Sequence, residues 1–473
     1  MISRSLLPGI RCLRSALRPV PVWTLSALLT PGAALGAEFD TKFSAGWSET
    51  YTDNVTASGA GGASSEWVRQ LTPGVSVKGV GRHLKLAVDY RLQDISYARG
   101  SSNDSQFHQL DATANVNALN ERLKFDVHVT HSQQIIDEQG TVSNSNITAT
   151  SNRTNVGTIS LNPGFDFRIG NYAVVNMNAG YDRVTYQSGT NPGGANKSLA
   201  IGISSGTRFN TLGWSLTSNA SKDGASDATQ RNVNAQLNYR VGAKTSVFAS
   251  TGYENNDFQS AEQTKGSIWN VGANWQVGPR TSLNASVGNR YFSRTYSLAL
   301  NHTMRRSSFS MNYNQSLQTT NSLQLGQPIF DDTGTFLVGF GVPVEQTDVF
   351  ITSTWNANYA LSSRRARFGL GFSQVNRESS RTQVDDVITS LNGSLGMTFP
   401  SSVSASLNAL YRTSEFGLSA RQDDFLSVGV SVSRRLRSDV TLNASFQRQT
   451  QSSTDSTADF TENALTLSLG FTL

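Results

Sequence analysis

The stretch LKLAVDYRL, residues 84–92, has an apolar or aromatic side chain at every second position and mostly polar side chains between them. The stretch LKFDVHV, residues 123–129, repeats the pattern. A period of two places alternate side chains on opposite faces of a β-strand, so each such strand has one face for an apolar environment and one for water. Repeated strands of about ten residues with this alternation are typical of transmembrane β-barrels.

The alternation recurs along the chain as far as its last residue. It predicts about 22 strands, within a range of 18 to 22, which begin near residues 39, 66, 83, 107, 122, 147, 172, 197, 211, 230, 244, 267, 281, 295, 307, 348, 365, 385, 402, 424, 437 and 461. Short turns, such as 80–82 and 277–280, alternate with longer polar loops, such as 52–65 and 136–146. Outer-membrane barrels have short turns in the periplasm, long loops outside and an even number of strands. We therefore expect an all-β, antiparallel, up-and-down barrel over residues 38–473, with both termini in the periplasm.

Residues 1–37 have the composition of a secretory signal peptide. Four arginines precede an apolar run from Val20 to Leu35, which is too short for a membrane-spanning helix of about 20 residues. Small residues at 34–37 predict cleavage after Gly36 or Ala37. Removal of the four arginines takes the formal net charge from +5 to +1, so the net charge of the mature chain does not predict nucleic-acid binding.

The mature chain has no thiol chemistry, because the single cysteine, Cys12, lies in the signal segment. No run of 18 apolar residues follows residue 37, which excludes a helical membrane protein. A secreted two-sheet sandwich or an extracellular fibre shows the same alternation. The C-terminus favours the barrel, because its alternate apolar residues resemble the signature that barrel-assembly machinery recognises, with a leucine in place of the usual terminal aromatic: Leu465, Leu467, Leu469, Phe471 and Leu473.

The sequence gives little evidence for a catalytic site or a metal site. The serine motif at 202–206 lies inside a strand pattern. A hydrolase elbow requires a helix directly after the serine, and no helix is predicted there. His128 and His131 are three apart on a strand and point to opposite faces. The acidic pairs at 331–332, 385–386 and 423–424 are more simply solvated loop charges than calcium ligands. We therefore expect no catalytic residues, no metal and no cofactor.

Polar positions between the apolar ones are rich in amides and hydroxyls. They are expected to line a hydrated lumen, with a carbohydrate track as the sharper alternative: Asn234, Gln236, Asn238, Asn284, Asn312, Asn314 and Asn443. Basic residues gather at the predicted periplasmic turns, where pairing with lipid phosphates is the simplest role.

The longest connection, 318–347, is unusually apolar. An apolar patch of this size on the outer surface would need cover or a function. Its aromatic residues Phe330, Phe336 and Phe340 are candidates for a constriction inside the barrel. The alternative is an extracellular extension of the neighbouring strands.

The segment WSETYTDNV, residues 47–55, resembles the start of the outer-membrane barrel proteins that are associated with PEP-CTERM/exosortase systems. The resemblance continues in RYFSRTY at 290–296 and over 348–377. It implies an envelope role beside exopolysaccharide production and export, with outer-membrane lipid, barrel-assembly machinery and either polysaccharide or export proteins as partners.

Two functions fit these observations. The first is a non-enzymatic, porin-like pore or conduit of the outer membrane for exopolysaccharide export or PEP-CTERM envelope sorting. The alternative is a non-conducting scaffold that tethers export partners. A ligand-gated receptor with an N-terminal plug is disfavoured, because strand alternation already begins at Phe39.

Overall fold

A computed structural model of the chain describes residues 36–59, 61–187, 193–261, 263–325 and 348–473. Within these ranges the chain forms one sheet of 22 strands. The strands are β1 (Glu38–Thr52), β2 (Glu66–Val80), β3 (Leu84–Tyr97), β4 (Ser105–Ala118), β5 (Leu123–Ile135), β6 (Arg153–Ile169), β7 (Ala173–Tyr186), β8 (Gly194–Ser205), β9 (Leu212–Asp223), β10 (Thr229–Arg240), β11 (Thr245–Asn255), β12 (Lys265–Gly278), β13 (Thr281–Asn289), β14 (Arg294–Thr303), β15 (Ser307–Thr319), β16 (Val349–Ser362), β17 (Ala366–Ser379), β18 (Asp385–Phe399), β19 (Val403–Phe416), β20 (Arg421–Arg435), β21 (Val440–Ser453) and β22 (Phe460–Thr472). A short helix, α2 (Thr320–Leu325), and two 3-10 turns, η2 (Pro400–Ser402) and η3 (Ser456–Ala458), complete the described elements.

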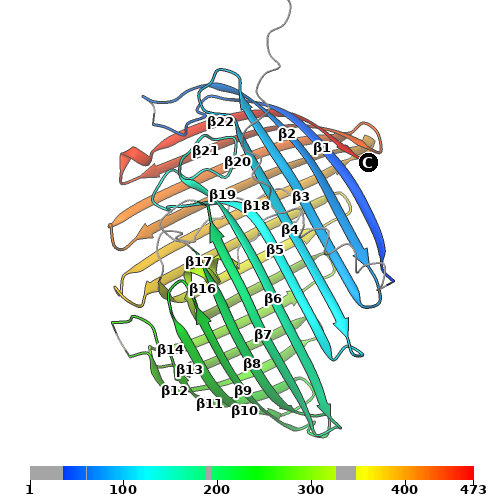
Figure 1. Ribbon diagram of the computed structural model, residues 1–473, viewed down its shortest axis with the longest axis vertical. Coiled ribbons are helices and arrows are strands. Elements are labelled where there is room, and N and C mark those ends of the chain that lie inside the picture. The colour runs from blue at the N-terminus through cyan, green and yellow to red at the C-terminus, as the bar shows by residue number, and fades with distance from the viewer. Residues whose placement is uncertain (1–35, 60, 188–192, 262, 326–347) are drawn as a thin grey trace, which may run out of the picture.

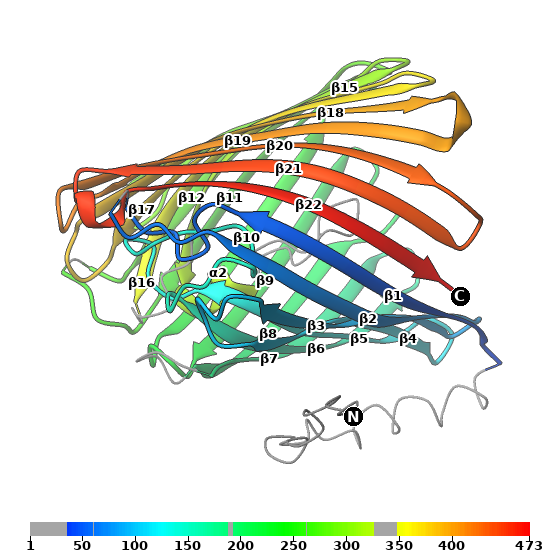
Figure 2. The same ribbon diagram turned by 90° about the horizontal axis from the view of Figure 1, so that it is seen from above.

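Every strand pairs with its neighbour in the sequence in antiparallel register, and β1 also pairs with β22. The sheet is therefore a closed barrel, as Figures 1 and 2 show. At the seam, Ser44 to Thr52 of β1 lie opposite Thr472 to Ala464 of β22. Closure leaves no unpaired sheet edge, which is the condition for a β-structure inside a lipid bilayer.

The outer surface of the barrel is apolar. Residues opposite each other in an antiparallel pair point to the same face, so the register assigns the faces strand by strand. Tyr51, Trp67 and Leu465 share one face around the seam and are more than a third exposed, although they are large and apolar. Val430 in β20 is 45% exposed in the same way. This band is the surface that contacts lipid.

The predicted 22-strand barrel is confirmed. Observed strand starts lie within a few residues of the predicted ones, with the largest difference at β6, which begins at Arg153 and not near residue 147. The connections on one side, such as 81–83 and 363–365, are short turns, whereas the other side has loops such as 53–65 and 136–152. We call these sides the periplasmic and extracellular ends. Both ends of the sheet, Glu38 and Thr472, lie at the periplasmic end.

The first 35 residues lie outside the described part of the chain, so the signal peptide and its cleavage site stay predictions. Within the described residues, no helix has the length and apolar character needed to cross a membrane.

Candidate functional site

The amides that were expected to line the lumen lie on inward faces. In β10, Asn234, Gln236 and Asn238 alternate with residues of the exposed outer face, such as Leu237. The remaining four lie on the corresponding faces of β13, β15 and β21: Asn284, Asn312, Asn314 and Asn443. Two of them donate to neighbouring polar side chains, Gln236 to Asn238 at 2.8 Å and Asn443 to Ser468 at 3.5 Å. This wall can exchange hydrogen bonds with water or with a polar solute.

The extracellular half of the lumen is crossed by the connection between β5 and β6, residues 136–152, which we call the crossing loop. Its base is held together by Asn152, whose side chain accepts a hydrogen bond from the backbone N–H of Asp137 at 2.8 Å and donates to the Asp137 carbonyl at 2.7 Å. From this base the loop reaches the inward faces of strands on the far side of the barrel.

One set of anchors comes from alternate glutamines of β21. Gln451 accepts a hydrogen bond from the N–H of Val142 at 3.0 Å and donates to the carbonyl of Gly140 at 3.3 Å. Gln449 accepts from the N–H of Asn144 at 3.2 Å, and Gln447 donates to the Asn144 side chain at 3.0 Å. These side chains satisfy the polar groups of the loop much as a neighbouring strand would.

A buried ion pair anchors the loop to β17. Glu138 of the crossing loop and Arg377 of β17 lie 2.6 Å apart, with side chains that are 8% and 1% exposed. Asp386 on β18 lies 3.7 Å from the same guanidinium. In the order of the closed sheet, β5 and β17 lie on nearly opposite walls. The loop therefore spans the lumen from one wall to the other.

Other contacts fasten the loop to the wall nearer its base. Asn146 donates to Gln93 of β3 at 2.8 Å, and the Tyr97 hydroxyl donates to the carbonyl of Ile147 at 2.9 Å. The N–H of Ala149 donates to the carbonyl of Val55 in the β1–β2 loop at 2.8 Å. Val55, Ile95 and Tyr97 belong to a buried apolar cluster against which Ile147 packs. The extracellular half of the lumen thus contains a packed core of its own.

A second segment also enters the lumen. Helix α2 follows β15, and its Asn321 donates to the inward carboxylate of Asp223 at the end of β9, at 3.0 Å. The candidate constriction residues Phe330, Phe336 and Phe340 lie beyond α2, outside the described residues, so the structure says nothing of them.

The crossing loop is a correction to the sequence analysis, which placed residues 136–146 among the external loops. An external loop has the same polar composition, so the local sequence cannot predict that this loop lies in the lumen. The predicted start of β6 is early for the same reason, because residues 147–152 belong to this loop.

The other predicted site residues are placed as follows. His128 faces inward, 3.1 Å from Asp111, whereas His131 is on the other face of β5. Among the described residues no cluster of histidine, cysteine or acidic side chains could hold a metal ion. The alternating residues near the C-terminus lie on the outer face of β22 beside Trp47 and Tyr51, with the last of them just beyond the strand: Leu465, Leu467, Leu469, Phe471 and Leu473.

Comparisons with known proteins agree with the barrel. The profile of a family described as a protein of unknown function, DUF481, matches residues 196–337, and no curated protein matches the chain. The chain is similar to the FrpB iron transporter from Neisseria meningitidis, with 10% identity and a TM-score of 0.52 over 92% of this chain and 82% of that chain.

It is also similar to a mutant of the ferric enterobactin receptor PfeA from Pseudomonas aeruginosa, with 10% identity and a TM-score of 0.50 over 93% of this chain and 81% of that chain. At such identities the likeness concerns the fold alone. The closed sheet of 22 strands, its apolar outer surface and its polar lumen together make this chain an outer-membrane β-barrel protein.

Proposed function

We propose that the protein is a non-enzymatic conduit of the outer membrane for hydroxyl-rich polar solutes, and that the crossing loop is its constriction. The observation that carries the proposal is the loop itself, which spans a polar lumen. It is fixed to the opposite wall by the ion pair of Glu138 with Arg377, and to β21 by Gln449 and Gln451. Barrels of 22 strands are wide, and outer-membrane transporters of this size have a filled lumen. Here the chain's own loops supply part of the filling.

The chemistry of the wall supports a polar cargo that forms many hydrogen bonds. Amide and hydroxyl side chains, such as Asn234 and Gln236 of β10, can both donate and accept hydrogen bonds, which suits sugar hydroxyls as well as water. The resemblance to PEP-CTERM/exosortase-associated barrels supports exopolysaccharide export or envelope sorting as the setting. Deletion of the gene should lower secreted polysaccharide, and complementation should restore it. Unchanged secretion would contradict this setting without bearing on conduction.

Conductance in a planar bilayer tests the constriction. Replacement of residues 138–150 by a short Gly-Ser linker keeps the base at Asp137 and Asn152 and removes the anchored part of the loop, including Glu138. We expect single-channel conductance to rise several-fold, because the lumen is then crossed by fewer segments. The matched control replaces residues 417–420, the β19–β20 connection with its exposed Leu418, and should leave conductance unchanged. Equal conductance in all three folded barrels would refute the constriction.

The alternative is a non-conducting scaffold. It is favoured by the buried apolar clusters at the extracellular end of the barrel, one of which joins Ala57 of the β1–β2 loop to Phe425 and Phe460. A scaffold predicts no channel openings from the folded wild-type barrel or from the barrel with the shortened crossing loop. Openings from either one would exclude it.

A further inference from the structure

We infer that a cavity beside the crossing loop is a binding site for an acidic sugar. The inference rests on the proposed function, which it deepens by naming the class of solute. The cavity has a volume of about 510 Å³ and lies at the extracellular ends of β3, β4 and β6, with residues 146–151 of the crossing loop along one side. This volume is within the range of small-molecule sites, about 300 to 1,000 Å³.

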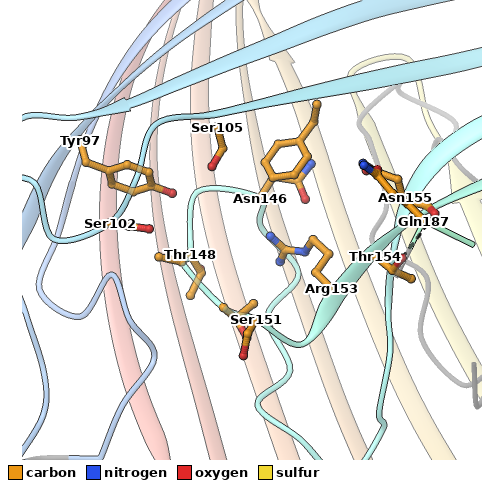
Figure 3. A pocket seen from close by; sticks show the side chains of 13 residues that line it. Tyr97, Ser102, Ser105, Asn146, Thr148, Ser151, Arg153, Thr154, Asn155 and Gln187 are labelled. Atoms are coloured by element: carbon orange, nitrogen blue, oxygen red, sulfur yellow. Dashed lines mark hydrogen bonds between the residues drawn. The ribbon is translucent and has the colours of Figure 1, made fainter. Parts of the chain in front are cut away.

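The lining of the cavity has the composition of a carbohydrate site. Six of its residues are serine or threonine, three carry amides, and two are aromatic and supply flat apolar surface: Ser102, Ser105, Thr148, Thr150, Ser151, Thr154, Asn146, Asn155, Gln187, Tyr97 and Phe107. Hydroxyls and amides can match the donors and acceptors of a sugar ring, and an aromatic face packs against its C–H groups. Figure 3 shows these side chains converging on the cavity from the strands and from the crossing loop.

Arg153 is the one charged residue among the described residues that line the cavity. Figure 3 shows its guanidinium between Tyr97 on one side and Asn155 with Gln187 on the other. Its Nη2 donates to the carbonyl of Ser145 at 2.7 Å, while its Nε is buried without a hydrogen-bond partner in the described part of the chain. The side chain as a whole is half-buried, and a guanidinium that is partly withdrawn from water is stabilised by an anion that accepts its hydrogen bonds.

A second buried atom in the lining also lacks a partner. Asn146 is 4% exposed, and its Oδ1 has no donor among the described residues, although its Nδ2 donates to Gln93. An acceptor and a charged donor that are both unsatisfied suit a ligand with hydroxyls and a carboxylate. A uronic acid unit has both groups, and a guanidinium binds a carboxylate in a fixed planar geometry.

Direct binding to the folded full barrel in detergent tests the site, and it does not require the barrel to conduct. The probes are digalacturonate and α-1,4-galactobiose, which has a CH₂OH group in place of each carboxylate. Wild-type protein should bind digalacturonate at least tenfold more tightly than galactobiose by calorimetry. Arg153→Gln should weaken digalacturonate binding at least tenfold and leave galactobiose binding within twofold, because the cation that pairs with the carboxylate is lost while a polar side chain remains.

The control variant is Arg168→Gln, which removes an arginine from the other end of the same strand, β6, outside the cavity. It should bind both probes as the wild type does. The site is refuted if digalacturonate does not bind, if galactobiose binds equally well, or if Arg168→Gln loses as much affinity as Arg153→Gln. Conductance is measured separately, so a conducting barrel without this affinity refutes only the site, and binding without conductance refutes only the conduit.

Discussion

The ion pair of Glu138 and Arg377 joins residues that are 239 positions apart in the sequence. Both side chains are almost fully buried, so each charge depends on the other for compensation, and Asp386 adds a second carboxylate beside the Arg377 guanidinium. Removal of one partner of a buried pair costs more than the pair contributes, because the remaining charge is left without its counter-ion. A single substitution in this pair should therefore weaken the attachment of the crossing loop to β17.

Glu138→Gln should loosen the loop without unfolding the barrel. We expect more frequent current fluctuations in single-channel records and faster cleavage within residues 136–152 by proteinase K. Glu49→Gln is the matched control, because Glu49 pairs with Arg69 at 2.9 Å on the outer face of the barrel. The reversed pair, Glu138→Arg with Arg377→Glu, should recover part of the effect. A Glu138→Gln channel as quiet as wild type would show that the ion pair does not hold the loop.

The sequence predicts some of these residues and not others. Asn234, Gln236 and Asn238 follow from alternation with Leu237 and its neighbours, because strand geometry alone places them on the opposite face. Arg153 does not follow from any pattern. Its environment is made by the folded crossing loop and by Tyr97 of β3, which lies more than 50 residues earlier in the chain.

At the scale of the element, a strand is specified locally and the crossing loop is not. Each strand has its own period of two, so its start is visible within a few residues. Residues 136–152 are polar, and polar residues suit a water-filled lumen and open solvent equally. Their position is set by Gln449 and Gln451 of β21, which only the closed barrel brings near.

The two faces of one strand should respond differently to the same substitution. In β20, Val430 is on the outer face opposite Leu407 and Phe446, and Ser431 is on the inner face, where its hydroxyl bonds to Ser406 at 2.7 Å. Val430→Arg should lower the free energy of unfolding in lipid vesicles by about 2 to 4 kcal/mol, the cost of a cation near the bilayer midplane.

Ser431→Arg should cost about 1 kcal/mol, the contribution of one neutral hydrogen bond, because its charge remains in the hydrated lumen. Both free energies can be measured by urea unfolding of the reconstituted barrel. Equal losses in the two variants would mean that the faces of β20 are assigned the wrong way round.

At the scale of the whole molecule, closure depends on the pairing of the first strand with the last. Ser48 of β1 and Ser468 of β22 are direct partners across this seam, on the inner face. Partners in an antiparallel pair have Cα atoms about 4.5 to 5.5 Å apart, which is within the span of a disulfide.

The double variant Ser48→Cys with Ser468→Cys should form a disulfide that links β1 to β22. After signal removal the chain has no other cysteine, because Cys12 lies in the predicted leader. The heat-denatured product should then run as a cyclic chain in gel electrophoresis and revert with reductant. The control pairs Ser48→Cys with Ser445→Cys of β21, one strand further along, and should stay linear. A linear chain in the first variant under oxidising conditions would contradict closure between these strands.

The contacts of the crossing loop also imply an order for the last steps of folding. The loop belongs to the β5–β6 connection and has anchors on β3, yet its other anchors are on β17, β20 and β21, which come much later in the chain. The loop can complete its contacts only after those late strands have joined the sheet. The arrival of the last strands therefore both closes the wall and fixes the loop across the lumen.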